Sequence, residues 1–338
     1  MRIPAPLAAV LALALVALVP VVANAATPSK LAYVTGLAGT HPRVHVAHAD
    51  GSGALTLGTG VDALISPDGA NVAIVTPYTR RGTSLVVRPA GGGAARTLAS
   101  TGDTLGPLTW SPDGALLAVV INTRRLVAID VASGARHVVA RGSIQGASFS
   151  PDGRRIAYAR SALPRLSAHV DVYVANADGS GTHRITHDGR SLWPIWGPTQ
   201  IAFTHERLRR NDAPVYQLRV MRPDGSGVRQ LTHLRIPRLL SGLTATAWSA
   251  DGMRLLAEYG GQDTSEAWTV DVASGRARDL TGRFDGVIGA GLSADGTTVL
   301  VQRGYFDDPQ RQSISTIPFG GGSTSLLVRQ GSAPSWGG

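Results

Sequence analysis

Arginines in two neighbouring irregular segments are the side chains best suited to recognise a ligand in this sequence. The planar guanidinium offers paired donors that match the two oxygens of a carboxylate or phosphate. The segments separate short runs of strand-like residues, so they are expected to be surface loops. The sequence therefore predicts an anion-binding surface, with an ordinary solvated, arginine-rich surface as the alternative. The candidate ligand-binding residues are Arg207, Arg209, Arg210 and Arg235.

Histidines in the same part of the chain form a second candidate site. His187 and His233 follow equivalent strands of successive repeats, and His205 with Glu206 begins the segment between them. Three imidazoles and a carboxylate can hold a divalent metal ion. No close ligand spacing supports such a centre, and the repeat alone explains two matched histidines. We therefore predict no resident cofactor, with a divalent metal at these four residues as the alternative.

Motifs for common catalytic sites are missing from the sequence. It contains no G-x-S-x-G, no H-E-x-x-H and no complete G-x-G-x-x-G between a strand and a helix. The Asp-Gly-Ser-Gly segments lack the ligand series and the closing Glu of an EF-hand, so turn chemistry explains them. The sequence favours a protein that is not an enzyme.

One short pattern repeats along the chain and determines the expected fold. An apolar residue followed by Ser-Pro-Asp-Gly, or a diverged version of it, recurs at intervals of 39 to 52 residues. A period near 45 is typical of a β-propeller blade. Pro and Gly suit a tight turn, and the Asp is expected to be structural. The apolar positions are Ile65, Trp110, Phe149, Trp196, Trp248, Leu292 and Trp336. The clearest turn residues are Asp113, Gly114, Asp152 and Gly153.

A second turn type, such as Asp178-Gly179, also occurs seven times. The first unit, residues 31–60, lacks an innermost strand, whereas residues 333–336 form one with nothing after it. The sequence therefore predicts an all-β, seven-bladed propeller of four-stranded antiparallel blades, closed by the C-terminal strand. Six blades are the alternative.

The repeat resembles that of TolB-like β-propellers. The matching stretches are FSPDGRRIAYAR (149–160), VDVYVANADGSGTHRITH (170–187) and YQLRVMRPDGSGVRQLTH (216–233). The resemblance covers nearly the whole mature chain and is to the family rather than to the Tol protein itself. That family includes the propeller of the Tol envelope system, propellers attached to peptidases and metal-using lyases that act on acidic sugars.

The first 25 residues have the composition of a secretory signal. Arg2 is followed by an apolar stretch, and Ala23 and Ala25 are the small residues that precede cleavage. We expect a signal peptide at 1–25 and one propeller domain at 26–338, with an uncleaved anchor as the alternative. The protein is then periplasmic, associated with the cell envelope or secreted. The absence of Cys excludes disulfides.

A net charge of +9 favours acidic partners. We therefore predict a monomeric, non-enzymatic binding or scaffold module for a protein or an anionic envelope glycan, not for nucleic acid, without a transmembrane anchor after cleavage. A metal-dependent lyase acting on an acidic sugar is the first alternative, and a quinone-dependent sugar dehydrogenase is the second. The predicted binding face consists of the irregular loops 77–83, 161–169, 204–214, 234–243 and 304–312.

Overall fold

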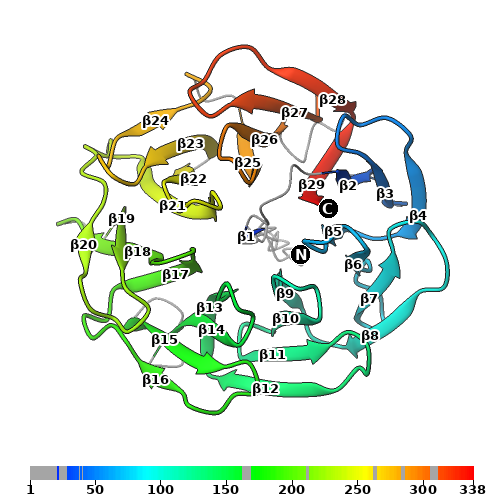
Figure 1. The fold of residues 1–338 in the computed structure, drawn as a ribbon, viewed down its shortest axis with the longest axis horizontal. Helices are drawn as coiled ribbons and strands as arrows, with labels where there is room; N and C mark the ends of the chain where they lie inside the picture. Colours follow the sequence, from blue (N-terminus) through cyan, green and yellow to red (C-terminus); the bar gives the residue numbers. More distant parts are fainter. Residues whose placement is uncertain are drawn as a thin grey trace, which may run out of the picture.

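The computed structural model describes residues 21–22, 29–37, 39, 41–161, 169–210, 213–261, 265–282, 286–304 and 311–338. All the secondary-structure elements assigned within these residues are β-strands. Figure 1 shows the strands arranged in a ring around a central axis. Among the described residues there is no helix with the length and apolar character needed to cross a bilayer. The predicted signal at 1–25 lies outside the described residues except for β1 (Val21–Val22), which pairs in parallel with Ala247 and Trp248.

In the described part of the chain the strands form five four-stranded antiparallel sheets and one nine-stranded sheet. Apart from β1, the nine-stranded sheet is described below as two antiparallel groups of four strands, and each group is given from the ring centre outward. The first group is β29 (Gly331–Gly337), β2 (Lys30–Thr35), β3 (Arg43–His48) and β4 (Leu55–Thr59). The second is β5 (Asp62–Ile65), β6 (Asn71–Val75), β7 (Thr83–Pro89) and β8 (Arg96–Thr101). The third is β9 (Leu105–Trp110), β10 (Leu116–Ile121), β11 (Arg125–Asp130) and β12 (Arg136–Arg141).

The fourth group is β13 (Ser143–Phe149), β14 (Arg155–Ser161), β15 (Val170–Asn176) and β16 (His183–Arg184). The fifth is β17 (Ser191–Trp196), β18 (Ile201–Leu208), β19 (Pro214–Met221) and β20 (Arg229–Gln230). The sixth is β21 (Leu240–Trp248), β22 (Arg254–Gly261), β23 (Ser265–Asp271) and β24 (Ala277–Asp279). The seventh is β25 (Val287–Leu292), β26 (Thr298–Arg303), β27 (Ser313–Pro318) and β28 (Ser325–Arg329). A parallel contact between Tyr216 and Gly242 links the fifth and sixth groups.

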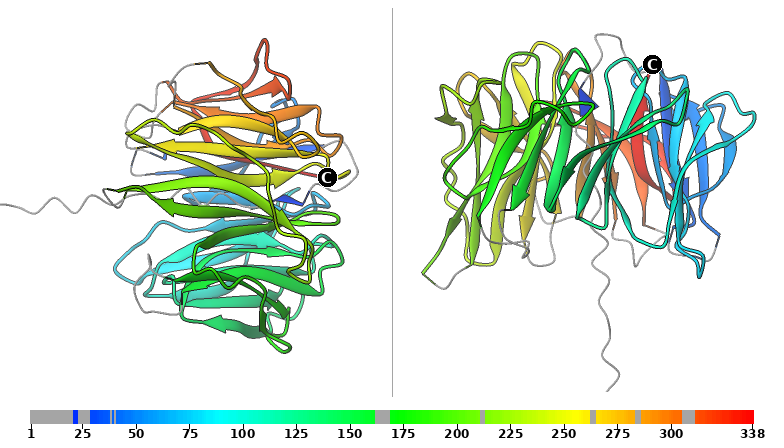
Figure 2. Two further views of the ribbon diagram at one scale, coloured as in Figure 1. Left: turned by 90° about the vertical axis from the view of Figure 1, so that its left-hand side faces the viewer. Right: turned by 90° about the horizontal axis from the view of Figure 1, so that it is seen from below.

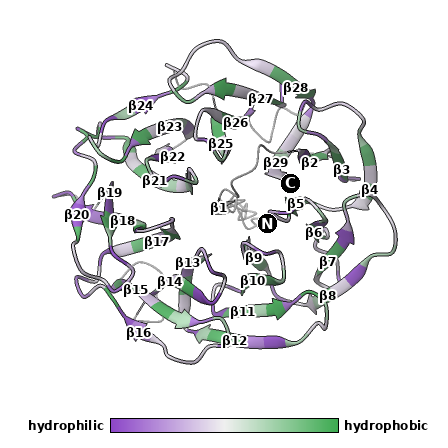
Figure 3. Cartoon of the chain, viewed as in Figure 1, coloured by the Kyte–Doolittle hydropathy of each residue, from purple (hydrophilic) through white to green (hydrophobic). Residues whose placement is uncertain are grey.

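The hydrophobic core lies between neighbouring groups. Middle strands such as β11 and β15 are hydrophobic, whereas the outer strands β16 and β20 are hydrophilic (Figure 3). Trp110, Trp196 and Trp248 end the inner strands β9, β17 and β21, and each is at most 6% exposed. The indole N–H of Trp110 donates to the Leu64 carbonyl at 3.0 Å, and that of Trp248 to the Ile195 carbonyl at 3.2 Å. The repeated aromatic position therefore joins each of these two strands to the preceding group.

The repeated Ser-Pro-Asp-Gly segments are tight turns held by their own side chains. The Ser150 hydroxyl donates to Asp152, which also accepts from the Arg154 backbone N–H at 3.1 Å. Gly153 has φ 70°, and Gly114 has φ 69° in the preceding repeat. The Asp113 carboxylate accepts equivalent bonds in that repeat. These turn carboxylates are used within the turn, as expected for structural residues.

Replacing Gly153 with Val is expected to lower the free energy of unfolding by roughly 1–3 kcal/mol, because a β-branched residue is strained at this φ. An added Cβ would lie 3.6 Å from the Ser111 Cβ, so the cost comes from the backbone rather than from a clash. Urea unfolding measures the loss. Gly153→Asn is the control, since Asn tolerates left-handed angles. Equal stability of the Val and Asn variants would contradict the turn geometry.

Candidate functional site

The arginine-rich segments lie where strands of the fifth and sixth groups end. β18 continues to Leu208 and β21 begins at Leu240, so the irregular segments in the described residues are 209–210 with 213, and 231–239. The first is shorter than the predicted 204–214, because pairing of β18 with β19 continues to Leu208 and Pro214. The second begins earlier than the predicted 234–243 and ends earlier, because β20 ends at Gln230 and β21 begins at Leu240. In the right-hand view of Figure 2, the β18–β19 hairpin (yellow-green) points away from the side that carries the C-terminus. We call the side of the ring toward which this hairpin points the loop face.

Arg209 clamps the two segments together. Its Nη1 donates to the Arg238 carbonyl at 2.6 Å. Its Nη2 donates to the Ile236, Pro237 and Leu240 carbonyls at 3.0, 2.7 and 3.2 Å. The guanidinium therefore binds four backbone carbonyls of this chain. The structure assigns Arg209 to positioning the loops, and this differs from the expected role as a ligand-binding side chain.

The other three predicted ligand-binding arginines are exposed. Arg207 and Arg210 flank the hairpin tip, and Arg235 lies in the second segment. Arg238, whose carbonyl Arg209 holds, is also exposed. The clamp thus places exposed cationic side chains from both sides of Arg209's contacts on one edge of the loop face. Most of the predicted loops 161–169 and 304–312 lie outside the described residues.

The predicted metal ligands are not gathered into one centre. His205 is buried on β18, and its Nε2 lies 3.1 Å from Asp188 Oδ2. His187 and His233 are exposed, and Glu206 follows His205 on the strand. Within the described ranges, no three His, Asp or Glu side chains are arranged to hold a metal ion. Sequence reasoning placed these residues together because they share one repeat position or one segment.

Asp188 instead forms a polar cluster with its neighbours on the loop face. It accepts from the Ser191 hydroxyl at 2.8 Å and from the Arg190 backbone N–H at 3.1 Å, and it lies 3.5 Å from Arg219 Nη1. Burial raises the pKa of Asp188, but hydrogen bonds from His205, Ser191 and Arg190 outweigh it and hold that pKa well below its usual range. Asp188 is therefore charged at neutral pH and orients the imidazole.

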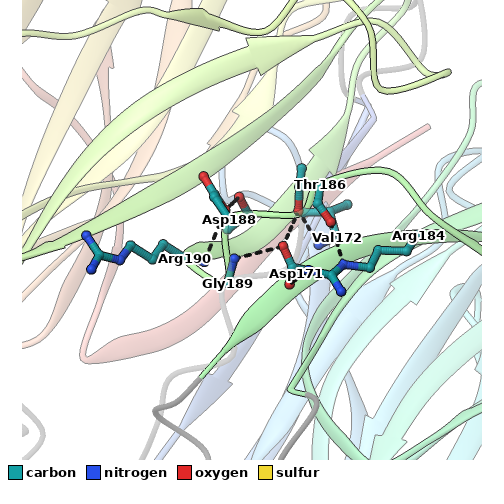
Figure 4. Close-up of polar contacts among 8 residues, drawn as sticks. Asp171, Val172, Arg184, Thr186, Asp188, Gly189 and Arg190 are labelled. Carbon is teal, nitrogen blue, oxygen red and sulfur yellow. Dashed lines mark hydrogen bonds and ion pairs between the residues drawn. The ribbon is translucent and has the colours of Figure 1, made fainter.

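A buried carboxylate beside this cluster fixes the connection between the fourth and fifth groups (Figure 4). Asp171 on β15 is 2% exposed and accepts from the Thr186 hydroxyl at 3.0 Å and the Gly189 N–H at 3.1 Å. Arg184 Nη2 donates to its second oxygen at 2.6 Å. Thr186 in turn accepts from the Val172 N–H at 2.9 Å. Three donors, from Thr186, Gly189 and Arg184, therefore satisfy a carboxylate that would otherwise be costly to bury.

The same arrangement recurs in the next repeat with Gln217 in place of the carboxylate. Thr232 donates to Gln217 Oε1 at 2.8 Å and accepts from the Leu218 N–H at 2.9 Å. Asp171 precedes Thr186 by the same fifteen residues that separate Gln217 from Thr232. Sequence reasoning missed these four residues, although this spacing was visible in the sequence. Their bonding indicates a structural role at the connections between groups.

A second set of polar and aromatic side chains adjoins the cluster. Glu206 lies opposite Tyr216 across β18 and β19, and Trp193 meets the Tyr216 ring edge to face at 5.4 Å. Burial raises the pKa of Glu206, while Arg190 and His205 partly offset this. Burial and the Glu206 charge raise the pKa of Tyr216 to about 12. The Tyr216 hydroxyl therefore stays protonated at neutral pH and can donate a hydrogen bond.

The Asp188 cluster is expected to make stability depend on pH in the acid range. Because its folded pKa is depressed, Asp188 contributes stability above the unfolded value near 4, and this is lost as pH falls through the folded pKa. Asp188→Asn should lower stability at pH 7 and reduce the slope of unfolding free energy against pH by up to one proton. Urea unfolding between pH 6 and pH 3 measures this. Identical slopes of unfolding free energy against pH for wild type and variant would refute this role of Asp188.

Comparison with known proteins agrees with the fold. A model of the family described as the lipoprotein LpqB β-propeller domain matches residues 40–194. No curated protein matches the sequence. TolB from Acinetobacter baumannii is 18% identical, with a TM-score of 0.56 over 91% of this chain and 82% of that chain. An oligogalacturonate lyase in complex with manganese is 16% identical, with a TM-score of 0.58 over 90% of this chain and 86% of that chain.

The β-propeller domain of the Trilobed protease from Pyrococcus furiosus has a TM-score of 0.68 at 12% identity. That alignment covers 90% of this chain and 94% of the protease domain. Four-stranded antiparallel sheets arranged in a ring define this protein as a β-propeller. The matches confirm its resemblance to the TolB-like propellers. At these identities the solved structures establish the fold and leave the ligand open.

Proposed function

We propose that this β-propeller is a non-enzymatic binding module that holds an anionic envelope or extracellular partner on its loop face. The observation that carries the proposal is the Arg209 clamp, which joins the end of β18, with the exposed Arg207 and Arg210 on either side of it, to the segment that bears the exposed Arg235. Preorganised loops lose little conformational entropy on binding. Exposed guanidinium groups on such loops are suited to carboxylates and phosphates.

We propose further that the protein is exported through residues 1–25 and acts as a monomer without a membrane-spanning anchor. The composition of that segment and the similarity to LpqB and TolB propellers support this. The partner is a protein, an anionic glycan or another anionic component of the envelope rather than nucleic acid. The net charge of +9 favours such acidic partners.

We propose that the seven strand groups are seven blades and that β29 closes the ring. Two observations support closure. β29 pairs with β2 through Leu31 and Trp336, and the seventh group packs on the first through Leu300 and Ile314 against Leu31. A closed ring has no free inner edge to aggregate.

Binding is favoured over the metal-dependent lyase by the arrangement of the histidines. His205 is bonded to Asp188, and His187 and His233 are exposed, so the described residues give a lyase no assembled metal centre. The manganese complex of the similar lyase is a property of that protein. The exposed Arg207, Arg210 and Arg235 are accessible to an anion.

Titration with polygalacturonate, a soluble anionic polysaccharide, tests the proposal. Replacing Arg207, Arg210 and Arg235 together with Gln should weaken binding at low salt by roughly tenfold or more, since hydrogen bonds to charged groups contribute ~1.5–3 kcal/mol each. Wild-type binding should also weaken as salt is raised. Isothermal calorimetry measures both.

A matched control removes the same charge from the opposite side of the ring. The three control residues are the exposed Arg154, Arg222 and Arg276. Arg154 lies in the turn between the first and second strands of its group, and Arg222 and Arg276 lie in turns between third and fourth strands. Their replacement by Gln should leave affinity within about twofold, because charges beyond the Debye length of ~8–10 Å are screened. Equal losses in the two triple variants would show a nonspecific charge effect and refute the loop face as the site.

A further inference from the structure

Two large apolar side chains stand exposed on the edge that Arg209 clamps. Leu208, the last residue of β18, is 51% exposed, and Leu239, immediately before β21, is 71% exposed. Arg209 follows Leu208 directly and donates to the carbonyls of Arg238 and Leu240, the two residues that flank Leu239. The two leucines are therefore held on one clamped edge although they are distant in sequence.

Cationic side chains surround this leucine pair. Arg207 and Arg210 lie within two residues of Leu208, Arg238 precedes Leu239, and all three are exposed. An apolar tip ringed by guanidinium groups matches the boundary of an anionic bilayer. There the leucines leave water for the acyl region while the arginines meet lipid phosphates. A soluble polyanion would use the arginines but give the leucines no apolar surroundings.

A second loop presents similar chemistry on the same face. The β6–β7 and β18–β19 connections both join the second and third strands of a group, so they lie on the same side of the ring (Figure 2). Tyr78 in the first of these connections is 63% exposed, and the neighbouring Arg80 and Arg81 are exposed too. Tyrosine prefers the level of the lipid headgroups. Two separate contacts would orient the ring with its loop face toward a membrane.

We propose that the Leu208–Leu239 edge docks on an anionic phospholipid surface. This inference rests on the proposed function, because it names the anionic partner of the same loop face. Two leucines form too small an apolar area for a stable protein interface, which buries about 800 Å² per partner. The geometry therefore favours a lipid surface over a protein partner.

Co-sedimentation with vesicles tests the proposal. The wild-type protein should bind vesicles of phosphatidylcholine with 30% phosphatidylglycerol, and bind pure phosphatidylcholine at least tenfold more weakly. Replacing Leu208 and Leu239 with Ser should weaken binding to the anionic vesicles by roughly tenfold or more. The matched control is Val228→Ser with Met253→Ser, which removes two similarly exposed apolar side chains on the opposite side of the ring. Vesicle affinity of the control should stay within about twofold of wild type.

A probe at a single cysteine gives a second readout, because the natural chain has none. An environment-sensitive fluorophore on Leu239→Cys should shift to the blue when anionic vesicles are added, and the same label on Met253→Cys should not. Equal shifts at both positions, or vesicle binding unchanged by the leucine replacements, would overturn the docking edge. Wild-type binding to polygalacturonate but not to vesicles would overturn the lipid inference alone. Binding to neither would overturn the proposed function as well.

Discussion

Removal of residues 331–338 is expected to lower the melting temperature by on the order of 10 °C or more, or to prevent folding altogether. The deletion takes away β29, which pairs with β2 from Lys30 to Thr35. It also removes the Ser335 hydroxyl, which accepts from the Ile65 N–H at 3.0 Å and donates to the Ala63 carbonyl at 3.1 Å. The first group would lose its inner strand and expose the edge of β2.

Differential scanning calorimetry measures this effect, and Ser335→Ala is the control. That variant keeps β29 but removes its hydrogen bonds to β5, so a drop of a few degrees is expected. A truncated protein that melts at the wild-type temperature would show that β29 does not close the ring. It would also revive the alternative of six blades, in which the terminal segment is dispensable.

The repeating part of the fold could be predicted because it depends on local chemistry. The Ser-Pro-Asp-Gly turn needs only its own side chains, and Gly153 has the left-handed φ that such a turn requires. The apolar position before it marks the end of each inner strand, as Trp196 and Trp248 show. The exact length of the β18–β19 hairpin was not predictable, because polar residues such as His205 and Arg207 continue the strand through pairing alone.

The site was harder to predict because its partners are distant in sequence. Arg209 resembles its exposed neighbours in the sequence, yet its guanidinium binds carbonyls 27 to 31 residues away. Backbone carbonyls carry no residue signature, so sequence alone could not separate a clamp from a ligand-binding arginine. Likewise, His205 was grouped with other histidines by type, whereas its actual partner is Asp188, seventeen residues earlier.

Replacing Trp196 with Ala is expected to lower the free energy of unfolding by roughly 3–5 kcal/mol, the usual cost of truncating a fully buried large aromatic side chain. Trp196 is 2% exposed and packs with Val172 and Phe203 between the fourth and fifth groups. The Arg155 guanidinium lies 4.9 Å from the centre of its ring. The change would leave a cavity where two groups meet.

Two further variants separate the sources of this loss, and a third tests the equivalent tryptophan of the next group; urea unfolding is the measurement for all of them. Trp196→Phe keeps an aromatic ring and should cost clearly less than the Ala variant, because the cavity it leaves is smaller. Arg155→Ala removes the cation–π contact while keeping the indole, and it should cost about 0.5–1 kcal/mol. Trp248→Ala should resemble Trp196→Ala, since Trp248 is equally buried and also loses its bond to the Ile195 carbonyl. Losses below about 1 kcal/mol at both tryptophans would contradict a core built between neighbouring groups.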